Sequence, residues 1–239
     1  MSFSQTPSSD FSQSSNKNPT QGNVVWIGSI IQQSNSRFVE GQSVLQRLFV
    51  MDIPTDASGK YKIQFSHQAT KGGIHAYDFV TNWATAISTS NAILSSTYVN
   101  INPCNDLGPK VTNCTAFDSY TPVTASAVSA ATYGTTVSNG DNVASRVAAF
   151  DAANGGASTA RGIQIRSSRT ISNAQLIMTG YTSGSDQYAE YELRWDGPTS
   201  GGSYNVLIQL AGHLAVGGDG TGVSYGEGKG SSAISGGPY

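Results

Sequence analysis

The stretch YKIQFSHQ, residues 61–68, alternates between two kinds of side chain at every step. One side of the predicted strand carries the aromatic and aliphatic groups: Tyr61, Ile63, Phe65 and His67. The other side carries Lys62, Gln64, Ser66 and Gln68. Successive side chains of a β-strand point to opposite faces, so this pattern predicts a strand with one face on a core and the other in solvent.

The same period of two recurs along most of the chain. Residues 188–196 place Ala189, Tyr191, Leu193 and Trp195 inward. Residues 43–53 are more continuously apolar, as expected for a strand buried on both faces. Further strands are predicted within residues 23–31, 161–167, 173–181 and 203–216, with turn sequences such as DASGK and TSGSD between them. Many short strands separated by such turns predict an all-β fold, a single β-sandwich or jelly-roll-like domain with long loops over residues 24–239.

Two segments do not follow this period. Residues 141–156, DNVASRVAAFDAANGG, have Val143, Val147 and Phe150 at helical spacing, with Asp141 placed to cap. The flanking glycines suit a strand as well, and a short helix is slightly favoured. The glycine-rich residues 212–239 predict a loop followed by a short strand near residues 233–235.

The composition excludes several classes of function. Charged residues make up 12% of the 239-residue chain, and the net charge is −2. Nucleic-acid binding needs a concentrated basic face, so it is not expected. No apolar run approaches the ~20 residues that span a bilayer, so membrane insertion is not expected either. Few charges with abundant hydroxyl and amide groups are typical of extracellular β-rich proteins.

Two cysteines lie in a loop-like sequence, NPCNDLGPKVTNC, residues 102–114. Two free thiols are one interpretation. The spacing favours a local Cys104–Cys114 disulfide, which suits an oxidising compartment. Asn113 begins the triplet NCT and is a possible glycosylation site.

Residues 1–23 form a polar tail in which Phe3 and Phe11 are the only aromatic side chains. Such a segment cannot build its own core, so we expect it to order only against a sheet edge or groove. An edge on a neighbouring subunit would make Phe3 and Phe11 assembly anchors.

The densest group of chemically capable side chains is TKGGIHAYDF, residues 70–79. The group consists of Lys71, Gly72, Gly73, His75, Tyr77 and Asp78. The glycines permit a sharp change of direction, and His75, Asp78 and Lys71 are close enough in sequence to interact. We predict a structural corner; a calcium site centred on Asp78 and a general base are the alternatives.

The remaining candidates for catalysis or cofactor binding are weak. The glycine-rich end lacks the spacing of a phosphate-binding loop, and Asp219 within GGDGTG is at most a weak calcium ligand. The three histidines lack zinc-ligand spacing, and His67 falls on the apolar side of its strand. Glu190 and Glu192 fall on the outward side of theirs, where solvated charge is the simpler interpretation. We expect no enzymatic activity and no cofactor.

Four stretches in order resemble a class of bacterial secreted surface-protein domains: SNSRFVEGQSVLQRLFV, TKGGIHAYDFVTNW, NPCNDLGPKVTNC and GHLAVGGDG…AISGGPY. That class shares a T-K-G-G-x-H-A-x-D-[FY] corner, a two-cysteine loop and a G-G-H…I-S-G-x-P-[FY] close. The resemblance covers residues 34–114 and 211–239, and this chain departs from it by reading A-G-H at 211–213. It implies an exported, β-rich, non-enzymatic domain and supplies no ligand.

These observations predict an extracellular structural protein, the homopolymeric subunit of a cell-surface filament, sheath or layer that assembles by exchange of terminal strands. The alternative is a carbohydrate-binding or adhesive β-sandwich module. A glycan site on such a module needs exposed aromatic rings beside amides, which the three tryptophans and eleven tyrosines could supply.

Overall fold

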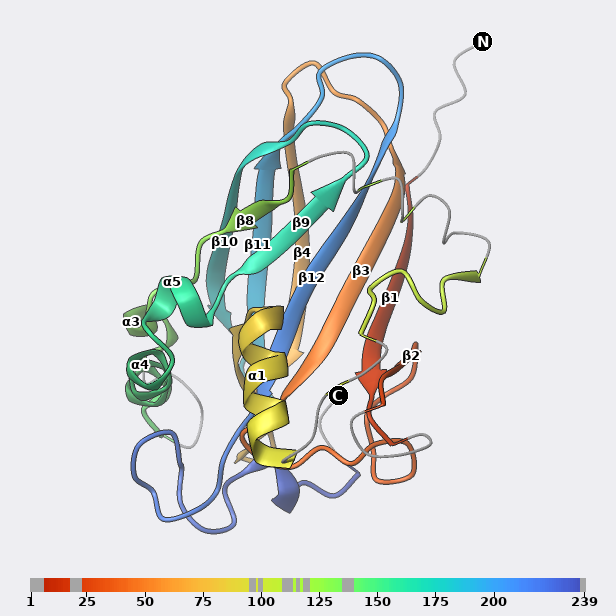
Figure 1. The fold of residues 1–239 in the computed structure, drawn as a ribbon. Coiled ribbons are helices and arrows are strands. Elements are labelled where there is room, and N and C mark those ends of the chain that lie inside the picture. Colours follow the sequence, from red (N-terminus) through yellow and green to blue (C-terminus); the bar gives the residue numbers. More distant parts are fainter. Residues whose placement is uncertain are drawn as a thin grey trace.

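The computed structural model describes residues 7–17, 23–94, 98, 101–108, 114, 117, 121–134 and 140–236. Two antiparallel sheets dominate it (Figure 1). Sheet A has the strand order β2 (Val25–Ile27), β1 (Ser8–Ser15), β3 (Ser43–Ile53), β12 (Tyr204–Leu214), β9 (Ile163–Ser167) and β8 (Val123–Ala125), and β7 (Tyr77–Thr81) also pairs with β12. Sheet C has the order β10 (Ser172–Tyr181), β11 (Tyr188–Asp196) and β4 (Lys60–Gln68).

The core lies between the inner faces of these sheets, which confirms the predicted sandwich-like all-β fold. Sheet A contributes Val206, Ile208 and Ile165, and sheet C contributes Tyr191 and Leu193. In Figure 1, β10, β11 and β4 form the layer behind β8, β9 and β12. The alternation predicted for residues 188–196 is correct on the inward side, because all four of those side chains are buried. On the outward side the prediction of a solvated charge is wrong for Glu192, which is buried by its ion pairs with Lys62 and Arg194.

The outer face of sheet A is covered as well, which explains why β3 is buried on both faces as predicted. Helix α1 (Trp83–Leu94) packs on β3 and β12. Asn82 begins this helix, because its side-chain oxygen accepts a hydrogen bond from the Thr85 N–H at 2.8 Å. Trp83 stacks on Trp26 with ring centroids 5.4 Å apart and donates its indole N–H to the Leu210 carbonyl at 2.8 Å. The sequence pattern did not predict this helix.

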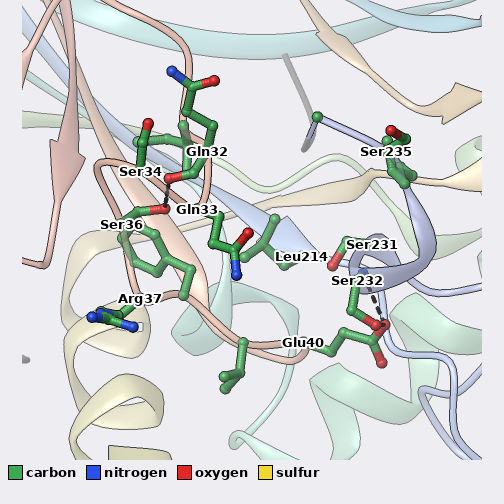
Figure 2. Close-up of a pocket in the computed structure, with 15 residues that line it drawn as sticks. Gln32, Gln33, Ser34, Ser36, Arg37, Glu40, Leu214, Ser231, Ser232 and Ser235 are labelled. Carbon is green, nitrogen blue, oxygen red and sulfur yellow. Dashed lines mark hydrogen bonds between the residues drawn. The ribbon is translucent and has the colours of Figure 1, made fainter.

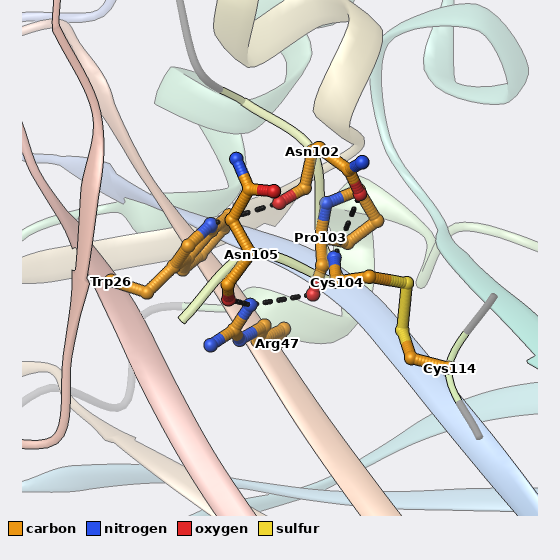
Figure 3. The surroundings of a disulfide bond; sticks show 7 residues. All are labelled: Trp26, Arg47, Asn102, Pro103, Cys104, Asn105 and Cys114. Atoms are coloured by element: carbon orange, nitrogen blue, oxygen red, sulfur yellow. Dashed lines mark hydrogen bonds between the residues drawn. A yellow bond between two sulfur atoms is a disulfide. The ribbon is translucent and has the colours of Figure 1, made fainter. Parts of the chain in front are cut away.

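The described part of the cysteine loop packs on the same face of sheet A (Figure 3). Cys104 and Cys114 form the predicted disulfide and pack with Phe49 and Leu207. Arg47 projects from β3 and donates to the Pro103 carbonyl at 2.6 Å and to the Asn105 carbonyl. The loop is therefore fastened to the sheet by a buried guanidinium.

That guanidinium also lies 4.5 Å from the centroid of the Trp26 ring. Burial lowers the pKa of Arg47 to about 10, against the opposing effect of the Asp10 and Asp106 carboxylates. Asn113 lies outside the described residues, so its predicted glycosylation stays a prediction.

Three short helices close one end of the sandwich: α3 (Ala130–Tyr133), α4 (Val143–Ala153) and α5 (Ala157–Ala160). Helix α4 confirms the helical interpretation of residues 141–156, with Val143, Val147 and Phe150 buried. Its cap is Asn142, whose side chain accepts from the Ser145 N–H, and not Asp141. Asp141 is instead bound by His75 and Lys229, so its carboxylate is turned away from the helix.

The C-terminal segment also differs from its prediction. Residues 231–233 form a 3-10 helix, η3 (Ser231–Ala233), where a short strand was predicted near residues 233–235. Glu40 explains the difference, because its carboxylate accepts from the Ser232 N–H at 3.0 Å and from the Gly217 N–H at 2.7 Å. A side chain thus satisfies backbone donors that a strand would have paired with another strand. No helix among the described residues is long and apolar enough to cross a bilayer.

Candidate assembly surface

The corner at residues 70–79 is a tight hairpin. Strands β5 (Thr70–Lys71) and β6 (Ile74–His75) pair with each other, and Gly72 and Gly73 form the turn with φ angles of 58° and 80°. A Cβ at either position would meet no atom within 4 Å. These glycines are therefore required by the left-handed backbone and not by close packing.

His75 and Asp78 do not pair with each other, although they are close in sequence. The His75 ring stacks on Tyr225 at 3.7 Å between centroids, and its Nε2 lies 3.1 Å from Asp141 Oδ2. Lys229 Nζ lies 3.0 Å from the other oxygen of Asp141. Burial lowers the pKa of His75, and the Asp141 carboxylate partly opposes that effect.

Asp78 pairs with a histidine from the far end of the chain. Asp78 Oδ1 lies 2.7 Å from His213 Nδ1, and the His213 ring stacks on Phe79 at 4.3 Å. A carboxylate that orients a histidine is part of many catalytic triads. Here the Asp78 and His213 side chains are 0% and 1% exposed, so a substrate has no access to them.

The corner thus connects distant parts of the chain. The His75 N–H donates to the Lys229 carbonyl at 3.0 Å, and Lys71 Nζ donates to the Ser235 carbonyl at 3.2 Å. Tyr77 is buried against Ile31, Val44 and Leu214. These contacts hold the C-terminal segment on the sandwich, as a structural corner would.

Neither calcium candidate has a ligand set around it. The described residues contain no group of three or more His, Cys, Asp or Glu side chains placed to hold a metal ion. Asp219 Oδ1 accepts from the Thr221 N–H at 2.9 Å and from its hydroxyl at 2.7 Å, which forms a local turn.

A groove of about 810 Å³ lies between residues 31–40 and 231–236 (Figure 2). Its lining combines amide and hydroxyl groups with apolar side chains: Gln32, Gln33, Ser34, Ser235, Phe38 and Val39. Glu40 reaches across it to Ser232. The tryptophans lie elsewhere, since Trp26 and Trp195 are buried and Trp83 stacks on Trp26. The groove therefore lacks the indole platform expected of a glycan site.

The two sheets differ in width, and β4 is one of the terminal strands that the described residues leave with a single neighbour. Sheet C ends at β4, and among the described residues β4 pairs only with β11. In Figure 1, β3 and β1 extend beyond β4. The inward side chains Tyr61, Ile63 and Phe65 are only partly buried, as expected for a strand at the margin of the core.

Phe11 marks the uncovered part of sheet A. It pairs in register with Leu48, which packs against the core between the sheets, so Phe11 lies on the inner face of sheet A. Phe11 is nevertheless 49% exposed, the highest value among the large apolar side chains that the structure describes. We refer to the side of β4 that pairs with no described strand, together with Phe11 and Leu48, as the open edge.

The N-terminal segment differs from the predicted separate tail. Residues Ser8–Ser15 form β1, inserted between β2 and β3 of their own chain, and Ser12–Ser15 are buried. The hydroxyl and amide side chains of β1 can be buried in the sheet because they form hydrogen bonds. Ser14 Oγ, for example, accepts from the Leu45 N–H at 3.0 Å. Phe11 thus belongs to the open edge, and Phe3 lies outside the described residues.

Comparisons of the chain with protein-family models, curated proteins and solved structures find no match. The functional inference therefore rests on the geometry of this chain. The sequence did not reveal the open edge. The alternation of residues 61–68 identifies the two faces of a strand, but it does not show whether one or two other strands pair with it. An apolar residue in a polar stretch, Phe11, was the one available signal.

Proposed function

We propose that this protein is a non-enzymatic structural protein of the cell exterior that assembles into a filament, sheath or layer by exchange of terminal strands. The open edge carries the proposal: among the residues that the structure describes, β4 pairs with β11 alone, and Phe11 is exposed on what should be a core face. An unpaired edge beside exposed apolar side chains is a template for a strand from another chain. A strand given by one subunit to a different surface of the next makes an open-ended assembly.

Two further features support a location outside the cell. The Cys104–Cys114 disulfide persists best in an oxidising compartment. The low content of charged residues is typical of extracellular β-rich proteins. The fully buried Asp78–His213 pair has no access to substrate, which favours a non-enzymatic role for it.

Assembly can be measured directly on the purified full chain. We expect the mass from light scattering after size exclusion to rise with concentration, and negative-stain images to show fibres or sheets. A single monomer mass over the whole concentration range, with no ordered objects on the grids, would overturn the proposal. A truncation should stop before Ser8, because removing residues 1–22 would also remove β1 and expose β3.

A second candidate is a carbohydrate-binding module, for which the groove offers a phenyl ring in place of an indole. Its amide and hydroxyl groups lie beside the half-buried ring of Phe38, which suits a neutral saccharide. A glycan array followed by calorimetry should show binding that the Phe38→Ala variant loses. Absence of binding on the array would remove this candidate without affecting the assembly proposal.

A further inference from the structure

The open edge has features that define what could occupy it. An incoming strand would pair with the backbone of β4, and its inward side chains would cover Phe11 and Leu48. Among the described residues, Lys60 and Lys62 bond to Asp196 and Glu192 on β11, at 2.8 and 3.1 Å. These two lysines are therefore engaged across the sheet. The occupant must be extended, alternate apolar with small polar residues, and bring no charge next to Phe11.

One segment of the chain outside the described residues matches these requirements at every position but Gln5. Residues 1–6 read MSFSQT, with Met1, Phe3 and the uncharged Gln5 on one side of an extended strand and Ser2, Ser4 and Thr6 on the other. None of these side chains is charged. At about 3.3 Å per residue the six residues span roughly 20 Å, within the length of the nine-residue β4. Pro7 follows and ends the segment before β1 begins.

The geometry of β1 favours a donor from another copy. Ser8 pairs with Met51 in sheet A, whereas β4 belongs to sheet C. Packed sheets lie about 10 Å apart, so the chain's own segment would use about three residues to cross between them. Only Met1–Phe3 would then lie beside β4. A segment from a second copy approaches without this constraint and can use all six residues.

We propose that residues 1–6 of a second copy add a strand to the free side of β4 and place Phe3 against Phe11. This inference rests on the proposed function and names the donor and the acceptor of the exchange. Donor and acceptor are different surfaces of each subunit, so every copy binds one neighbour and is bound by another. Phe11 is then part of the acceptor, and Phe3 is the anchor that the segment donates.

The acceptor can be tested separately from assembly. The protein lacking residues 1–6 is titrated into a peptide of residues 1–7 that carries a fluorophore at its C-terminus, and anisotropy is recorded. We expect saturable binding that weakens about tenfold or more with a Phe3→Ser peptide, because a phenyl group is left out of an apolar contact. The Phe11→Lys acceptor should weaken binding to a similar extent. Ile93→Lys, which changes a 42% exposed side chain on α1, is the matched control and should bind like the parent protein.

The outcomes separate this inference from the proposed function. No saturable binding, or equal binding by the Phe11→Lys and Ile93→Lys proteins, would overturn the inference, while fibres formed by the full chain would still support assembly. A third outcome combines three results: the peptide binds the truncated protein, the full chain does not bind the peptide, and the full chain is strictly monomeric. These results would show that each chain occupies its own open edge. That result would overturn exchange between copies.

Discussion

Acidification should destabilise this protein through His67, a buried histidine at the end of β4. Its Nε2 lies 2.7 Å from Gln46 Oε1, and its Nδ1 has no hydrogen-bond partner among the described residues. The neutral ring therefore donates from Nε2, and a proton on Nδ1 would be buried without an acceptor. Burial lowers the pKa of His67 from its ordinary value of 6.5 to about 4.

The sign and size of the effect follow from linkage. The unfolded chain takes up a proton below pH 6.5, while folded His67 stays neutral down to about pH 4. Stability from this site is complete above pH 6.5 and is lost as the pH falls towards 4. Between pH 8 and pH 5 the loss is about 2 kcal/mol. For a chain of this length that lowers the Tm by about 4–8 °C.

The assay is urea unfolding followed by circular dichroism at pH 8 and pH 5, for the parent protein and the His67→Gln variant. Glutamine can still donate to Gln46 but does not titrate. His75, whose pKa burial also lowers, titrates in both proteins, so the difference between them isolates His67. We expect the parent to lose about 2 kcal/mol more than the variant on acidification. Equal losses in the two proteins would refute the reasoning.

Three further perturbations test other parts of the structure. Reducing the Cys104–Cys114 disulfide should lower the free energy of unfolding by about 2.7 kcal/mol, the loop-entropy value for ten residues of separation. The control is a Cys104→Ala/Cys114→Ala variant, whose Tm should be insensitive to reductant. Arg161→Met should lower the free energy of unfolding by about 3–5 kcal/mol, because it removes the guanidinium that bonds to the buried Asp151 carboxylate at 2.7 and 2.8 Å. Adding Asp151→Leu to this variant should restore much of the lost stability. Strictly additive losses from the two substitutions in denaturant unfolding would contradict this. Glu40→Ala should release residues 217–232 from the sandwich, because the Glu40 carboxylate bonds to the N–H groups of Gly217 and Ser232. Proteolysis of this segment should be faster than in the parent protein, while the far-UV dichroism stays unchanged. Equal cleavage rates in the two proteins would count against this prediction.

The sequence predicted the strands well, because their signal is local. Side chains alternate across a strand wherever it lies, so residues 61–68 and 188–196 could be assigned inner and outer faces without their neighbours. The disulfide was also a local prediction from a short loop. Helix α1 was missed, because its residues carry no strong apolar stripe and its buried side, around Ala86, is defined by the sheet beneath it.

Pairing and coverage were decided only by the tertiary structure. His75 and Asp78 lie three residues apart, yet they bond to Asp141 and His213, which the fold brings from elsewhere in the chain. The polar residues 8–15 became a sheet strand because β3 supplies strand partners for residues 8–13 and β2 supplies them for residues 13–15. The sequence alone determines which side chains share a face. Whether that face is covered depends on how many strands each sheet contains, and contacts between distant segments set that number. In the described part of the chain they leave β4 with β11 as its single strand partner and Phe11 exposed.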